Sequence, residues 1–142
     1  MVLKTYQGLY GIIWLMLFLI LIQSGAINFP GVAYVHMGLG ALVLVISYIN
    51  YDSVAKTACP DRTKRIVKTY FSFSIAQVVL GAIIFVVGVY DLFGICQMGV
   101  IQFLHLFIAI AMITQAASAA TSYDMWEEKE FLQPAKTEAT SL

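Results

Sequence analysis

Charged residues are scarce in this sequence of 142 residues, and three long stretches have none at all. Charged side chains make up 11% of the chain, against roughly 25% in a soluble globular domain. The stretches without any Asp, Glu, Lys or Arg are 5–51, 69–90 and 92–123. So few charges cannot cover a water-exposed surface, so we expect an integral membrane protein. The formal net charge of zero gives no indication of nucleic-acid binding.

The charge-free stretches have room for four membrane-spanning helices. A spanning helix needs about 20 predominantly apolar residues. The first stretch has room for two, divided by the sequence NFPG at 28–31, because proline breaks a helix and glycine permits a tight bend. We predict an all-α four-helix bundle over 1–121 and a cytoplasmic tail over 122–142, a short amphipathic piece followed by disorder. The expected helices lie at about 8–27, 33–50, 67–90 and 98–120.

Basic residues are absent from two of the segments that join these helices. All eight Lys and Arg lie in the N-terminal segment, the loop at 51–68 or the C-terminal tail, and the short loops at 28–32 and 91–97 have none. The positive-inside rule therefore predicts a cell-membrane protein with both termini in the cytoplasm. This topology places Cys59 and Cys96 on opposite sides of the membrane, so they cannot pair, since a disulfide needs Cα atoms within about 7 Å.

Histidine is also rare, and the two that exist occupy matching places. His36 and His105 each lie near the outer end of an expected helix, and those two helices run in the same direction. Four residues later come Gly40 and Ala109, which share a helix face with the preceding histidine. The halves therefore resemble a parallel repeat, two related helix pairs about an axis along the membrane normal. We expect the two imidazoles to face each other across that axis.

Two facing imidazoles in a helical bundle could hold a metal group from opposite sides. A planar macrocycle between them would be a six-coordinate b-type heme, and the small residues would admit it. The alternative is structural, because a membrane histidine can simply hydrogen-bond to a neighbouring helix. A copper site is a further alternative, since imidazole and sulfur ligands suit Cu(I). Its candidate ligands are His36, Met37, Cys96, Met98 and His105.

Four glutamines in the expected membrane helices leave two interpretations open. They could line a heme or quinone pocket, or they could form hydrogen bonds between helices. They are Gln23, Gln77, Gln102 and Gln115.

The third and fourth helices also carry a pattern that resembles the heme A synthase family. In FSIAQVVLGAIIFVVGV, Gln77, Leu80 and Gly81 match a Gln-x-x-Leu-Gly segment of that family, and His105 in IQFLHLFIAIAMI matches the histidine ligand that follows. His36 with Gly40 matches the family's other histidine. The resemblance covers about residues 8–120. It implies a single four-helix half of an eight-helix protein, as in compact archaeal members, with a histidine pair as heme ligands.

This sequence departs from the family at one chemically important position. Active members have a glutamate three residues before the second-helix histidine, where this chain has Ala33, and the first outer loop lacks their cysteine pair. We therefore expect a heme b-binding protein of a respiratory chain, in electron transfer or heme handling, with other membrane subunits as partners. The alternatives are a non-catalytic accessory subunit of a terminal oxidase or similar complex, with or without heme, and a compact heme A synthase. Whether the chain is an enzyme stays open.

Overall fold

Four long helices make up almost all of the described chain. The computed structural model describes residues 5–90 and 95–132. Within these ranges only Phe29 and the connection at 56–60 are not helical. The predicted all-α, four-helix architecture is therefore confirmed. The helices are α1 (Thr5–Asn28), α2 (Pro30–Ala55), α3 (Asp61–Tyr90) and α4 (Ile95–Leu132).

The break between α1 and α2 is a single residue, shorter than the expected turn at 28–31. Phe29 has an extended backbone, with φ −128° and ψ 112°. Pro30 can follow it at the first helical position, where its missing N–H needs no partner. The carbonyl of Phe29 accepts the N–H groups of Val32 and Ala33 at 3.0 and 3.2 Å. Gly31 is therefore helical, and the proline starts α2.

All four helices extend beyond the expected limits at the end of the bundle that holds the 56–60 connection. Helix α1 begins at 5 where 8 was expected, α2 ends at 55 where 50 was expected, α3 begins at 61 where 67 was expected, and α4 reaches 132 where 120 was expected. The sequence limits marked the apolar runs, whereas backbone hydrogen bonding continues through the polar residues that follow. The amphipathic piece expected at the start of the tail is thus the end of α4, and 133–142 lie outside the described residues.

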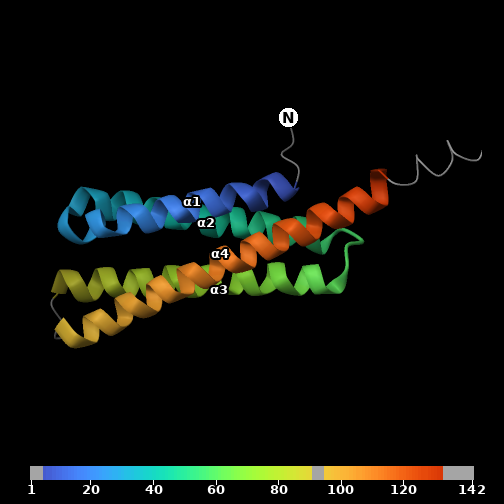
Figure 1. The fold of residues 1–142 in the computed structure, drawn as a ribbon. Coiled ribbons are helices and arrows are strands. Elements are labelled where there is room, and N and C mark those ends of the chain that lie inside the picture. Colours follow the sequence, from blue (N-terminus) through green and yellow to red (C-terminus); the bar gives the residue numbers. More distant parts are fainter. Residues whose placement is uncertain (1–4, 91–94, 133–142) are drawn as a thin grey trace, which may run out of the picture.

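The helices form two antiparallel hairpins, α1–α2 and α3–α4, that pack side by side (Figure 1). Each helix contacts two neighbours, in the pairs α1–α2, α2–α3, α3–α4 and α1–α4. The four helices therefore form a square in cross-section. Helices α2 and α4 occupy opposite corners of this square and run in the same direction. The start of α1 and the end of α4 lie at one end of the bundle, together with the 56–60 connection. We call this the basic end and the opposite end the histidine end.

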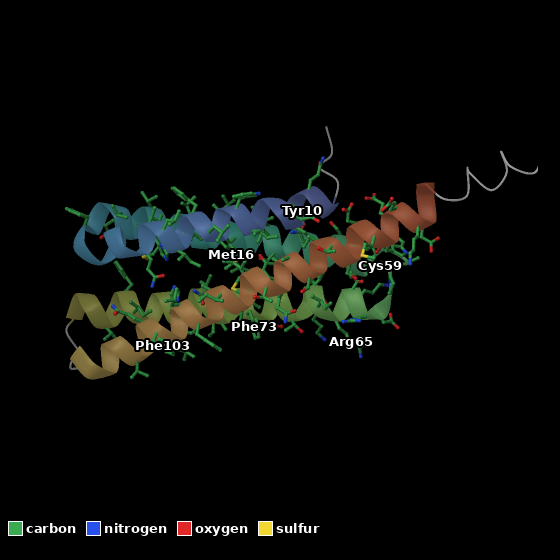
Figure 2. All side chains as sticks on the ribbon, in the orientation of Figure 1. Tyr10, Met16, Cys59, Arg65, Phe73 and Phe103 are labelled. Atoms are coloured by element: carbon green, nitrogen blue, oxygen red, sulfur yellow. The ribbon has the colours of Figure 1, made fainter. Side chains whose placement is uncertain are left out.

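Two apolar clusters fill the bundle between the hairpins. The first lies in the middle and includes Met16 of α1, Val43 of α2, Tyr70 of α3 and Met112 of α4. The second, at the basic end, joins side chains of all four helices around Cys59 of the 56–60 connection. Figure 2 shows Met16 between the hairpins, whereas Cys59 and Arg65 lie toward the basic end.

Large apolar side chains also cover the outside of the bundle. Trp14 is 73% exposed, Leu21 75% and Phe103 69%. Among the described residues, three stretches are long and apolar enough to cross a membrane, and the apolar part of α1 is shorter, at Gln7–Gln23. The outward apolar surface and these lengths agree with a membrane bundle. The three candidate spans are Gly31–Ala55, Asp61–Gly88 and Gly99–Glu130.

Buried hydroxyl groups connect the helices between the middle of the bundle and the basic end. The Ser47 hydroxyl lies 2.7 Å from the Tyr70 hydroxyl and 2.6 Å from the backbone oxygen of Val43. The hydroxyls of Thr63 and Ser122 lie 2.6 Å apart and connect α3 to α4. These bonds join α2 to α3 and α3 to α4.

Candidate functional site: a cavity between two histidines

A cavity of about 670 Å³ lies among the four helices toward the histidine end. Small-molecule and cofactor pockets typically measure roughly 300–1,000 Å³. Its lining is mainly apolar, with a few imidazole and amide groups among aliphatic side chains. All the site residues predicted from the sequence line this cavity, namely His36, Gly40, Gln77, Gly81, His105 and Ala109.

The two histidines approach each other from helices that do not touch. His36 projects from α2 and His105 from α4, the diagonal pair of the square. Their ring centroids lie 6.3 Å apart, and the ring planes are inclined by 48°. Helices α2 and α4 run in the same direction, and His36 lies six residues after the start of α2 and His105 ten residues after the start of α4. The expectation that the imidazoles face each other agrees with this geometry.

Both rings have a buried nitrogen that lacks a hydrogen-bond partner among the described residues. These atoms are Nδ1 of His36 and Nδ1 of His105. A buried polar group without a partner costs free energy. The backbone carbonyl of Leu19 lies near the His36 ring. The unpaired nitrogens are therefore available to a ligand in the cavity.

Gln77 lies beside His105 and lines the cavity as well. Its Nε2 donates to the backbone oxygen of His105 at 3.0 Å, which connects α3 to α4 at the level of the imidazole. Its Oε1 is buried without a partner among the described residues. Both interpretations of this glutamine therefore apply, since it bonds across helices and borders the cavity. Gln23 and Gln102 also line the cavity, whereas Gln115 does not.

The small residues near the histidines serve different purposes. A Cβ added to Gly81 would lie 3.3 Å from Cε1 of His105, so this glycine lets the ring pack closely against α3. A Cβ added to Gly40 would meet nothing within 4 Å, so this glycine leaves open space beside His36. Ala109 is 6% exposed and belongs to the central apolar cluster, where it closes one side of the cavity.

The sequence analysis named Gln23 of α1 as a candidate pocket residue but missed the rest of the α1 contribution to the cavity. Met16, Leu19 and Ile20 line it together with Gln23. Their spacing of three and four residues places them on one helix face, which is the available signal. An apolar face of this kind looks the same as one that packs in a core. Only the position of α1 opposite α3 distinguishes the two.

The copper alternative gains little from the described residues. They contain no group of three or more His, Cys, Asp or Glu side chains that could hold a metal ion. Met37 lines the cavity, but the side chains of Cys96 and Met98 lie outside the described set. Cys59 is a free, buried cysteine at the basic end. The prediction that it forms no disulfide with Cys96 stays a prediction, because the side chain of Cys96 lies outside the described set.

No protein-family model, curated protein or solved structure matches this chain. The cavity, its two histidines and the membrane-compatible fold are therefore the observations from which a function can be inferred.

Proposed function

We propose that this chain is a membrane protein that binds a b-type heme between His36 and His105. The observation that carries the proposal is the separation of the two rings, whose centroids lie 6.3 Å apart. Metal–imidazole bonds are about 2.0–2.1 Å long, so two imidazoles on opposite sides of one metal ion have ring centres roughly 6 Å apart. The observed spacing therefore suits a metal held between the rings without a movement of the helices.

The cavity around the rings fits a flat apolar group. It has a volume of about 670 Å³, Gly40 leaves it open beside His36, and the Nδ1 atoms of both histidines need a partner. A ligating histidine usually donates its other ring N–H to a carbonyl or carboxylate, and the Leu19 carbonyl lies near His36. A bound heme would supply a one-electron redox centre. The aliphatic lining would exclude water from it.

The carboxylates of such a group would find amides at the histidine end. Gln23 and Gln102 line the cavity from α1 and α4, and each amide can donate hydrogen bonds to a carboxylate. The sequence has no Lys or Arg in 28–32 or 91–97. The proposal therefore assigns these contacts to glutamine side chains, to water, or to a cation of a partner subunit.

We infer that α1 also crosses the membrane, which gives four spans in place of the three candidate spans. Helix α1 packs against α2 and α4 and is 24 residues long, enough to cross the hydrocarbon region. Lys56, Arg62, Lys64, Arg65 and Lys68 all lie at the basic end. Lys56 donates a side-chain hydrogen bond to the Asp52 carboxylate, which raises the pKa of Lys56, so this group is charged at neutral pH. We infer that the basic end and both termini face the cytoplasm of a cell membrane.

The proposed role is electron transfer or heme handling in a respiratory chain, together with other membrane subunits. The exposed apolar side chains of α1, such as Trp14 and Leu21, give partner helices a surface to pack on. This surface also supports the second candidate, a non-catalytic accessory subunit of a terminal oxidase or similar complex. A compact heme A synthase is the weaker alternative, because Ala33 lines the cavity and no Asp or Glu does so among the described residues.

The heme proposal is tested by adding heme b to the purified apoprotein. We expect saturable binding at one heme per chain in the wild type, and loss of binding in the double variant His36→Ala/His105→Ala. Phe103→Ala is the matched control, because this side chain lies on α4 near His105 but is 69% exposed. It should bind heme like the wild type. Absence of binding by a folded wild type would overturn the proposal, and stable copurification with oxidase subunits would then favour the accessory role.

A further inference from the structure

The two histidines have unequal surroundings, although they face each other across one cavity. His105 is 8% exposed and packs against α3. Gln77 donates to its backbone oxygen at 3.0 Å, and a Cβ at Gly81 would lie 3.3 Å from its ring. The ring is therefore closely surrounded on the α3 side.

His36 is held more loosely. It is only partly buried, and its helix neighbours Val35 and Met37 are exposed. Gly40 follows it one turn later on the same face of α2, and a Cβ there would meet nothing within 4 Å. The backbone carbonyl of Leu19 on α1 lies near the ring. There is thus space beside this imidazole into which it can turn while the helices keep their places.

We propose that His105 is the permanent ligand of the heme and His36 the replaceable one, so that the His36 side binds a small neutral diatomic ligand such as carbon monoxide. This inference rests on the proposed function. With heme bound, the exchange would release the His36 nitrogen from the metal and replace it with one bond to the incoming molecule, with no net electron transfer.

The unequal support predicts different effects of removing each ligand. His36→Ala should keep most of the heme, now held by His105 alone. His105→Ala should lose most of it, because the remaining ligand is the loosely held one. In the wild type only the fraction with His36 detached can take up carbon monoxide, and this lowers the apparent affinity by that fraction. His36→Ala should therefore bind carbon monoxide at least about tenfold more tightly than the wild type.

The test is a carbon monoxide difference spectrum of the reduced, heme-loaded full-length protein in detergent, for wild type, His36→Ala and His105→Ala. We expect a carbon monoxide complex in the wild type, tighter binding in His36→Ala, and return of the six-coordinate spectrum of His36→Ala when free imidazole is added. The wild-type spectrum alone is decisive if a variant fails to fold. A heme-loaded wild type that takes up no carbon monoxide, or equal heme loss in both variants, would refute the inference and leave the proposed function standing. A wild-type protein that binds no heme would refute both the inference and the proposed function.

Discussion

The imidazole rings of His36 and His105 lie 6.3 Å apart, centroid to centroid, on two helices that are not in contact. Each ring therefore reaches into the centre of the bundle from opposite corners of the square. The two rings are too far apart to form a direct hydrogen bond with each other. The Nδ1 atom of each ring also has no hydrogen-bond partner among the described residues. The proposed heme between them would give both nitrogens a partner.

The contact between Gly81 and His105 predicts a sensitive position on α3. In Gly81→Ala the new methyl group would lie 3.3 Å from Cε1 of His105, so the ring has to move by a few tenths of an ångström. Changes next to a metal ligand typically cost roughly 10–100-fold in metal affinity. We expect a fall of this size in heme affinity, measured by competition with a heme-binding apoprotein. Gly11→Ala is the control, because its Cβ would meet nothing within 4 Å, and it should bind like the wild type.

Gln77 is expected to position His105 through the backbone of α4. Gln77→Leu removes the 3.0 Å hydrogen bond to the His105 carbonyl, and hydrogen bonds between membrane helices contribute about 0.6 kcal/mol on average. We expect a small loss of stability and a change in the midpoint potential of the heme, measured by redox titration. Gln115→Leu, which lies outside the cavity lining, should leave the potential as it is. Equal potentials in all three proteins would show that Gln77 has only a packing role.

Gly8 and Asn50 form a close contact between α1 and α2 at the basic end. A Cβ at position 8 would lie 2.7 Å from Oδ1 of Asn50, which is 4% exposed. Overpacking of this kind typically costs about 1–3 kcal/mol. Gly8→Ala should therefore lower the unfolding temperature in detergent, followed by circular dichroism. In the Asn50→Ala background the same change should cost much less, and strictly additive effects would contradict the contact.

The proposed membrane orientation predicts the behaviour of reporter fusions. Green fluorescent protein after Leu142 should fluoresce, because the C terminus is expected in the cytoplasm, and alkaline phosphatase there should be inactive. Alkaline phosphatase fused after residue 93, in the loop expected outside, should be active. The opposite pattern in the two fusions would invert the topology without any effect on the fold.

Much of the cavity could be predicted from the sequence, because histidines and charged residues are so rare in it that their positions are informative. Only two histidines exist, and the charge-free stretches fixed the depth of each, so His36 and His105 could be paired before the structure was known. The roles of Gly40 and Gly81 could not be separated in this way, because both are small residues on a helix face. Whether a glycine leaves open space or touches a ring depends on the neighbouring helix.

The parts that sequence could not predict depend on how the helices pack. The side chains that α1 contributes, such as Met16 and Leu19, have the spacing of any buried helix face. The helix limits were misjudged because hydropathy marks the apolar run, whereas the helix continues through the polar residues that follow, as α4 does to Leu132. The bond from Gln77 to the His105 carbonyl joins residues 28 positions apart and follows only from the packing of α3 on α4.

The most direct test of the account is a reduced-minus-oxidised visible spectrum of freshly purified wild-type protein, with a pyridine hemochrome assay to identify the heme. The account predicts a b-type α band at one heme per chain, reduced or lost when His36 and His105 are both replaced by Ala, and unchanged in Phe103→Ala. A folded wild-type protein that contains no heme and takes up none when heme b is supplied would contradict it, and the two histidines would then have a structural role.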